Sequence, residues 1–210
     1  MYERVIKRAI DIFLSLMGII VLAIPMLVIA LAIKIDSKGP VFFCQKRVGI
    51  HKKYFSILKF RTMRTDTPHD APTHELSDPK KWITKVGAFL RKTSLDELPQ
   101  LFNIFVGQMS VIGPRPALWN QEDLIAERDK YGANDVRPGL TGWAQINGRD
   151  ELEIPVKAKL DGEYVERLSF GFDCKCFFGT ITSVLKSDGV VEGGTGELKK
   201  NEKNEQEVGK

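Results

Sequence analysis

The chain of 210 residues is poor in the side chains that build zinc sites and disulfide frameworks, with only three cysteines and three histidines. The cysteines are Cys44, Cys174 and Cys176. One Cys-x-Cys pair without a second pair is not a zinc pattern, and the histidines lie in polar, loop-like sequence. An odd number of cysteines forms no complete disulfide framework. The cysteine content therefore favours a reducing compartment.

The chain also lacks the features of a nucleic-acid-binding protein. The formal charge is +4 and the sequence pI is about 8.9, a mild excess that does not by itself indicate an anionic polymer as partner. No RNA- or DNA-binding motif occurs, and the aromatic residues do not alternate with basic ones as a stacking surface would require. We expect no nucleic-acid partner.

Charge is absent from residues 12–33, which are long enough and apolar enough to cross a bilayer core of about 30 Å as a helix. Too long for a signal peptide, this run predicts a membrane-bound protein. Basic residues lie on both sides of this apolar run. Because positive charge near a membrane segment marks the cytoplasmic side, both flanks are expected on that side of the membrane. Pro25 near the middle of the run removes a helix hydrogen bond. These features favour a re-entrant helix–break–helix that enters and leaves by one face. A kinked helix that crosses the membrane remains the alternative.

The rest of the chain predicts a helix-rich α+β fold. Alternating residues at 41–49 and 54–61 predict two short strands, and residues 82–90 carry an apolar stripe at helical spacing. Further helices are expected over residues 119–131, 156–168 and 173–185, the last with an apolar face typical of core or membrane-interface contact. We predict a membrane segment at 1–36, a compact catalytic domain at 37–188 and a disordered tail at 189–210.

Two adjacent carboxylates, Asp96 and Glu97, stand out between a basic pair and an apolar run. Ser94 followed by Glu97 forms a capping box, so a helix is expected to begin at Ser94. Asp96 would then lie in its first turn, where free N–H groups attract phosphate. Acidic residues in a first turn are ordinary at helix starts, so local sequence alone favours a structural role in which Glu97 only caps the helix. Downstream, Pro114 and Pro116 stiffen the backbone around Arg115.

Five motifs in this order resemble the bacterial sugar transferase family, the monotopic polyprenol-phosphate phosphoglycosyl transferases. The resemblance extends from about residue 7 to residue 189. The motifs are Gly-Pro-Val-Phe-Phe at 39–43, Lys-Phe-Arg-Thr-Met at 59–63, Thr-Ser-Leu-Asp-Glu-Leu-Pro-Gln-Leu-Phe-Asn at 93–103, Met-Ser-Val-Ile-Gly-Pro-Arg-Pro at 109–116, and Arg-Pro-Gly-Leu-Thr-Gly-Trp-Ala-Gln-Ile-Asn-Gly-Arg at 137–149.

The resemblance implies transfer of a sugar 1-phosphate from a UDP-sugar to polyprenol phosphate, with release of UMP. It also implies a re-entrant membrane helix, interfacial amphipathic helices, Mg²⁺ as cofactor, and a location on the cytoplasmic face of the inner membrane. The partners would then be UDP-sugar, polyprenol phosphate and membrane lipid. Association into a homo-oligomer or with later glycosyltransferases of capsule or exopolysaccharide biosynthesis stays open.

The family's Asp-Glu dyad falls on Asp96 and Glu97. We expect Asp96 to be the nucleophile and Glu97 to be a base or a metal-positioning group, with both near Mg²⁺. Five basic side chains are candidates to neutralise phosphate oxygens: Lys59, Arg61, Arg91, Arg115 and Arg149. Gln145 and Asn147 are expected near the uridine or sugar, and Asp161 is expected to orient an arginine.

One position departs from the family pattern. The family commonly has Ser-Pro at the membrane break, where this chain has Ile24 and Pro25, so the usual hydroxyl partner of a freed carbonyl is missing. Residues 66–68 and 116–121 resemble capsule initiators that use N-acetylated amino sugars, which favours such a donor. The alternative function is a membrane-anchored scaffold of a glycan-assembly complex that has lost catalysis.

Overall fold

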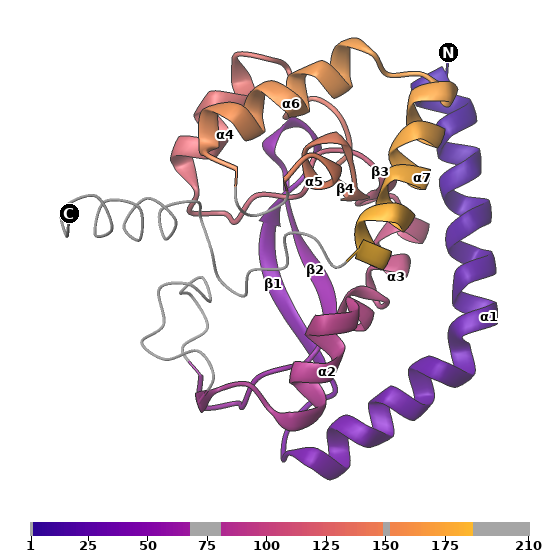
Figure 1. Ribbon diagram of the computed structural model, residues 1–210, viewed down its shortest axis with the longest axis vertical. Coiled ribbons are helices and arrows are strands. Elements are labelled where there is room, and N and C mark those ends of the chain that lie inside the picture. Colours follow the sequence, from indigo (N-terminus) through magenta and orange to yellow (C-terminus); the bar gives the residue numbers. More distant parts are fainter. Residues whose placement is uncertain (1, 68–80, 149–151, 187–210) are drawn as a thin grey trace, which may run out of the picture.

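The computed structural model describes residues 2–67, 81–148 and 152–186. A short π-helical stretch, η1 (Tyr2–Ile6), leads into the long helix α1 (Lys7–Asp36), which lies along one side of the remaining elements (Figure 1). Two small sheets and several helices make up those elements. The predicted helix-rich α+β class is confirmed. Arg149 and the tail at 189–210 lie outside the described residues.

Helix α1 has the length and composition of a membrane helix, and residues 12–33 within it carry no charge. It is one hydrogen-bonded helix of 30 residues, Pro25 included, rather than two separate helices. Its course bends (Figure 1). Large apolar side chains on its outer face, such as Val21 and Ile24, are exposed. The re-entrant path through a membrane therefore stays a prediction.

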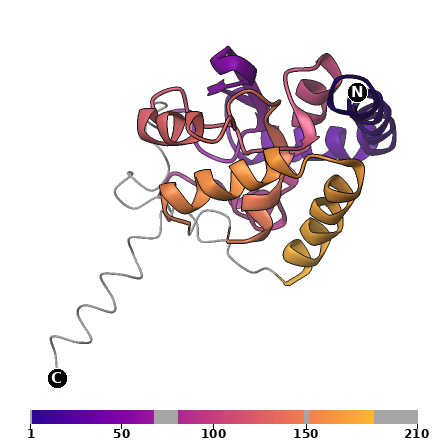
Figure 2. The ribbon, with the colours of Figure 1, turned by 90° about the horizontal axis from the view of Figure 1, so that it is seen from above.

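The first turns of α1 carry polar side chains that are buried against the rest of the protein. Lys7, Asp11 and Ser15 have small exposed fractions, and Figure 2 shows this part of α1 end-on at the edge of the molecule. Asp11 Oδ1 accepts hydrogen bonds from the Ser110 hydroxyl and the Val111 amide, at 3.0 and 2.9 Å. These polar contacts fix one side of α1 to the domain and leave the other side apolar.

The predicted strands form an antiparallel hairpin, β1 (Phe42–Val48) and β2 (Tyr54–Phe60), joined through the 3₁₀ turn η2 (Ile50–Lys52). Alternate residues of β2 point inward, and Phe55 and Ile57 pack on Ile104. The opposite end of β2 meets the membrane helix, because Phe60 is buried with Ile33 of α1.

The helix at residues 82–90 begins later than the apolar stripe predicts. Ile83 forms an isolated bridge with Met63, and Thr84 is the N-cap of α2 (Lys85–Thr93), accepting from the Gly87 amide at 3.0 Å. Leu90 on its inner face is almost fully buried, which stabilises the fold by about 1.5–3 kcal/mol relative to an exposed side chain.

A helical segment begins directly after Ser94, as predicted, but Ser94 does not form the predicted capping box. Ser94 has φ 56° and ψ 16°, and its amide closes the end of α2 by donating to the Arg91 carbonyl. An N-cap needs extended backbone, so a left-handed Ser94 cannot provide the capping box. The dyad instead lies on a 3₁₀ turn, η5 (Leu95–Glu97), and α3 (Gln100–Val106) follows. Asp96 and Glu97 lie in the first turn of this segment, and binding of phosphate there stays a prediction.

The C-terminal half places helices around a short parallel ladder, β3 (Ser110–Ile112) with β4 (Gly139–Thr141). The predicted helices are confirmed with shifted ends, as α4 (Glu122–Asp129), α6 (Ile154–Glu166) and α7 (Phe170–Lys186). A further short helix is α5 (Trp143–Ile146). Tyr164 and Phe172 are buried together over Ile112, so α6 and α7 close the core above this ladder.

Candidate active site

The Asp96–Glu97 pair lies where α2 ends and α3 begins, beside β2. Because Ser94 turns the chain, Glu97 does not fold back to cap a helix, and its carboxylate is free to meet other elements. Asn103 docks α3 on β2: its Oδ1 accepts from the Leu58 amide at 2.9 Å and its Nδ2 donates to the Ser56 carbonyl at 2.8 Å. This docking sets η5 against the Lys59 end of the strand.

Glu97 is bound by two cations from distant parts of the sequence. Lys59 Nζ donates to Glu97 Oε1 at 2.7 Å, and Arg115 Nη2 donates to the same oxygen at 2.6 Å. The Oε2 atom receives a longer contact, 3.4 Å, from Arg115 Nη1. Burial by itself raises the pKa of Glu97, but Arg115 and Lys59 outweigh it and keep that pKa well below its usual range. Glu97 is therefore ionised near neutral pH.

Asp96 is mostly buried, but its carboxylate makes weaker contacts with cations than that of Glu97. Its contact with a cation is long, 3.9 Å from Oδ2 to Lys59 Nζ, and its side chain is 13% exposed. Burial raises the pKa of this carboxyl, Lys59 opposes the rise, and the negative charge of Glu97 adds to it. Two neighbouring carboxyls thus have pKa values displaced in opposite directions, an arrangement typical of catalytic pairs.

Arg91 approaches the same site from the last turn of α2. Its Nε donates to the Thr62 hydroxyl at 2.9 Å, and its charge lowers the pKa of Asp96. The close approach of α2 depends on Gly87, where an added Cβ would lie 2.0 Å from the Thr62 carbonyl oxygen. Thr62 is a positioning contact that the sequence analysis missed, although it lies inside one of the motifs.

Arg61 does not join the dyad. It is buried, and its guanidinium donates to three backbone carbonyls that follow α1, those of Pro40, Lys38 and Ser37, at 2.6, 2.9 and 3.0 Å. The expected contact of Arg61 with phosphate is therefore not supported. Residues two apart on a strand point to the same face, so Lys59 and Arg61 would lie side by side if β2 continued. Because β2 ends at Phe60, Arg61 points toward the end of α1 instead.

The glycine-rich segment after β4 contributes Gln145 and Asn147. Both side-chain amide atoms of Gln145 are buried, and neither has a hydrogen-bond partner among the described residues. Buried polar atoms without partners are rare in folded proteins and suggest a missing ligand. Asn147 is exposed and donates to the Trp143 carbonyl of its own helix at 2.7 Å. Arg149, the remaining basic candidate, lies outside the described part of the chain.

Asp161, expected to orient an arginine, binds Arg128 of α4. Nε and Nη2 of Arg128 donate to Asp161 Oδ2 at 2.8 and 2.6 Å, and Nη1 donates to the Arg115 carbonyl at 2.9 Å. Burial raises the pKa of Asp161 and Arg128 opposes the rise. Arg128 was not among the predicted site residues, because nothing in its local sequence distinguishes it from a surface helix residue.

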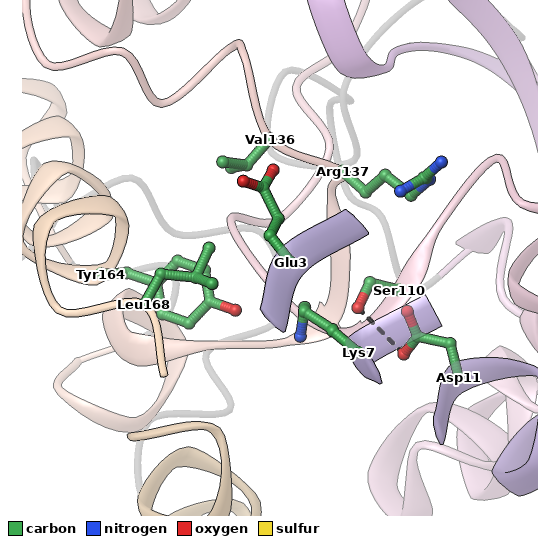
Figure 3. Close-up of a pocket in the computed structure, with 8 residues that line it drawn as sticks. All are labelled: Glu3, Lys7, Asp11, Ser110, Val136, Arg137, Tyr164 and Leu168. Carbon is green, nitrogen blue, oxygen red and sulfur yellow. Dashed lines mark hydrogen bonds between the residues drawn. The ribbon is translucent and has the colours of Figure 1, made fainter. Parts of the chain in front are cut away.

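A cavity elsewhere in the molecule lies between the start of α1 and β3 (Figure 3). It is lined by Glu3, Lys7, Asp11, Ser110, Val136, Arg137, Tyr164 and Leu168. Its volume is about 10 Å³, roughly the space of one water molecule. Such a volume excludes a nucleotide sugar, so the dyad remains the candidate active site.

The dyad offers two carboxylates, fewer than the three acidic, histidine or cysteine side chains of an all-protein metal site, which the described residues do not contain. Magnesium binds carboxylate oxygens and commonly completes its shell with substrate phosphates and water. Asp96 and the Oε2 atom of Glu97 offer such oxygens, because Lys59 and Arg115 make their short contacts to Glu97 Oε1. The residues present therefore fit the cation.

A family model described as bacterial sugar transferase matches residues 2–187. The chain belongs to the bacterial sugar transferase family. The match covers α1, Asp96 and Glu97, and the helices that close the core.

Among relatives, the undecaprenyl-phosphate glucose phosphotransferase of Komagataeibacter xylinus is 41% identical over 86% of this chain and 36% of the relative. The exopolysaccharide production protein PSS of Rhizobium leguminosarum bv. phaseoli is 43% identical over 87% of this chain and 96% of the relative. The UDP-N-acetylgalactosamine-undecaprenyl-phosphate N-acetylgalactosaminephosphotransferase of Aeromonas hydrophila is 36% identical over 88% of this chain and 44% of the relative. The chain thus spans less than half of some relatives and nearly all of another.

Proposed function

We propose that this sugar transferase moves a sugar 1-phosphate from a UDP-sugar to undecaprenyl or a similar polyprenol phosphate and releases UMP. The observation that carries the proposal is the unequal environment of the dyad. Glu97 is bound by two cations, whereas the carboxylate oxygens of Asp96 have no short contact to a cation among the described residues. The names of several relatives describe the same class of transfer.

In the first step, a carboxylate oxygen of Asp96 attacks the sugar-bearing phosphorus. An Asp–O–P bond forms, the bond from that phosphorus to the bridging oxygen breaks, and UMP leaves with the electron pair. In the second step, an oxygen of polyprenol phosphate attacks the same phosphorus and the Asp–O–P bond breaks. Splitting one transfer into two displacements is the usual benefit of a covalent intermediate.

Lys59, Arg91 and Arg115 surround the reacting phosphates with positive charge. A raised pKa makes the Asp96 carboxylate the more basic and more nucleophilic of the pair. The lowered pKa of Glu97 makes it a weak base, so we assign it to positioning of charge and metal. When bound, Mg²⁺ would neutralise diphosphate oxygens and the departing UMP.

We further propose that α1 is re-entrant and that the domain lies on the cytoplasmic face of the inner membrane. Both ends of α1 bind the same domain. Near its start, Arg8 donates to the Ile104 and Phe105 carbonyls, each at 2.7 Å. At its end, Asp36 Oδ2 accepts from the Val86 amide at 3.0 Å. A membrane-crossing helix would place one of these ends on the opposite side, away from its partner.

The exposed apolar side chains of other helices support interfacial contact with lipid. Phe89 of α2, Phe105 and Val106 of α3, and Phe178 of α7 are all exposed. Helices α2 and α3 pack on α1, and α7 is bound to its start through Lys7 and Asp173, so these side chains would enter the headgroup region beside α1. A membrane-bound acceptor with a long lipid chain would reach the dyad from this side.

We propose an N-acetylated amino sugar as the sugar of the UDP-linked donor. Names of relatives include both glucose and N-acetylgalactosamine donors. The resemblance of residues 66–68 and 116–121 to capsule initiators favours an N-acetylated amino sugar. We assign the side-chain amide of Gln145 to binding uridine or the sugar, because both of its polar atoms are buried and unpartnered within the described chain.

The test is UMP release from a panel of UDP-glucose, UDP-galactose and their N-acetylamino counterparts, with undecaprenyl phosphate and Mg²⁺. Activity with one donor, loss on chelation by EDTA and recovery with added Mg²⁺ are expected. Silence with every donor, from protein whose thermal unfolding is cooperative, would favour the scaffold function.

Topology is tested separately by labelling with a membrane-impermeant maleimide. Single cysteines replace Glu3 and Lys53, on either side of α1, after Cys44 and Cys174 are changed to serine and Cys176 to alanine. A re-entrant helix leaves both sites unlabelled in intact cells and labelled after permeabilisation. Labelling of one site in intact cells would establish a crossing helix.

A further inference from the structure

A layer of contacts behind the dyad fixes the loop that presents Arg115. Pro114 and Pro116 have no amide N–H, so this loop is bound to the domain through its carbonyl groups. The Pro114 carbonyl accepts from the Gly139 amide at 2.9 Å, and the Pro116 carbonyl accepts from Arg47 Nη1 at 3.0 Å. The carbonyl between them, that of Arg115, accepts from Arg128.

Arg128 is suited to this task by its burial and its fork of donors. Its side chain is 4% exposed and that of Asp161 is 1% exposed. Two of its nitrogens bind Asp161 Oδ2, which fixes the plane of the guanidinium, and Nη1 then points at the Arg115 carbonyl. Asp161 also neutralises Arg128, so a second positive charge does not repel Arg115.

We propose that Arg128 is a positioning residue for the transfer reaction, acting through the backbone of Arg115 on the contact between Arg115 and Glu97. The inference rests on the proposed function, in which Glu97 positions charge beside Asp96. Arg128 touches neither the substrate nor the reacting carboxylate. The contacts form a chain: Asp161 of α6 binds Arg128 of α4, Arg128 binds the Arg115 carbonyl, and the Arg115 side chain binds Glu97.

The test uses Arg128→Lys, because Arg128→Ala would leave Asp161 buried without a cation and endanger folding. Lysine keeps the charge but lacks the fork that binds Asp161 and the Arg115 carbonyl together. We expect kcat for UMP release to fall about 10- to 100-fold, with KM for the UDP-sugar changed much less. Lys130→Ala, an exposed basic residue at the end of the same helix, is the matched control and should leave kcat unchanged.

A double-variant comparison separates positioning from stability. If Arg128 acts through Arg115, the Arg115→Lys/Arg128→Lys variant loses no more activity than Arg115→Lys alone. Independent roles would multiply the two losses. Thermal unfolding of each variant shows whether a loss of kcat merely follows a loss of folded protein, and multiplied losses or wild-type kcat in Arg128→Lys would overturn the inference.

A second measurement does not depend on turnover. Arg115 Nη2 donates to Glu97 Oε1 at 2.6 Å in the wild type, so the Arg115 guanidinium is held in one place and can be followed by ¹⁵N NMR. Arg128→Lys should increase the mobility of this guanidinium, because the Arg115 carbonyl loses its donor. An unchanged Arg115 signal would refute the positioning role. Wild-type protein that releases no UMP, but whose Arg115 signal responds to Arg128→Lys, would refute the proposed function alone.

Discussion

Two groups of buried charge in this molecule use the same residue types in different ways. The dyad cluster comprises Lys59, Asp96, Glu97 and Arg115. The α1 anchor comprises Lys7 and Asp173 with the hydroxyls of Tyr2 and Tyr164. In the anchor, Asp173 Oδ2 accepts from Tyr2 and Lys7 at 2.5 and 2.7 Å, and Oδ1 accepts from Tyr164 at 2.7 Å.

Both carboxylate oxygens of Asp173 thus have close partners, and the Lys7 and Asp173 side chains are 9% and 10% exposed. In the dyad cluster, the contact of Asp96 to Lys59 is 3.9 Å long, and Arg115 is 38% exposed. The carboxylate of Asp173 is fully hydrogen-bonded, and it holds α1 and α7 together. The carboxylate of Asp96 has no short contact with a cation among the described residues, and it lies beside a solvent-accessible arginine, so it can receive an anionic substrate and a metal.

Asp96→Asn is expected to have the largest effect on activity in the dyad cluster. The amide has nearly the same shape but cannot attack phosphorus, so UMP release should fall by about 10⁴-fold or more. The measurement is single-turnover UMP formation, with thermal unfolding as the folding control. Appreciable turnover by this variant would rule out the covalent intermediate.

Lys7→Met tests the anchor. It leaves Asp173 buried without its cation, which should lower the free energy of unfolding by about 3–5 kcal/mol. Lys52→Met is the matched control: Lys52 pairs with Asp129 at 2.9 Å, but the two side chains are 54% and 44% exposed. Loss of that pair should cost about 0–1 kcal/mol.

Thermal unfolding in detergent measures both costs. Adding Asp173→Asn to Lys7→Met removes the uncompensated charge and should restore part of the stability. Equal destabilisation by Lys7→Met and Lys52→Met would mean that the anchor is no more than a surface ion pair.

Glu97→Gln is expected to change the pH dependence of UMP release. Ionised Asp96 is needed for attack, so activity should fall as pH drops through its raised pKa. The neutral amide of this variant removes a negative charge that raises the pKa of Asp96, and it releases Lys59 and Arg115, which lower that pKa. The acidic limb of the rate profile should therefore move to lower pH, while the maximal rate falls about 100-fold.

The rate of UMP release across acidic and neutral pH measures both effects. Asp135→Asn, at an exposed acidic residue paired with His51, is the control and should leave the limb in place. Movement of the limb to higher pH in Glu97→Gln would contradict the assignment of the nucleophile to Asp96.

The smallest effect is expected for Thr62→Val. It removes the hydroxyl that accepts from Arg91 Nε and keeps the side-chain shape. One such hydrogen bond contributes about 0.5–1.5 kcal/mol, so UMP release should fall by no more than about tenfold. Thr65→Val, in the same connection but outside this contact, should have no effect on the rate, and equal losses in the two variants would remove Thr62 from the site.

Local sequence predicted those features that depend on neighbouring residues. Uninterrupted apolar residues marked α1, alternation marked β1 and β2, and helical spacing marked α4, α6 and α7 within a few residues of their ends. The motif around Asp96 and Glu97 indicated the family, which the family model confirms. The roles assigned to individual site residues stay predictions.

Tertiary structure decided which charges meet. Glu97 binds Lys59, 38 residues earlier, and Arg115, 18 residues later. Arg61 lies in the same motif as Lys59 and turns away to bind carbonyls after α1. Ser94 has the residue type of an N-cap, yet a left-handed backbone makes it the end of α2.

The physical reason is that sequence periodicity fixes only the local conformation and the buried face of an element. The direction of a long side chain, and the cation or carbonyl that it reaches, depend on how distant elements pack. Arg128 shows this most clearly, because its partners, Asp161 and the Arg115 carbonyl, come from two other segments. The sequence by itself determined the membrane helix and the dyad, and packing alone determined the surroundings that separate Asp96 from Glu97.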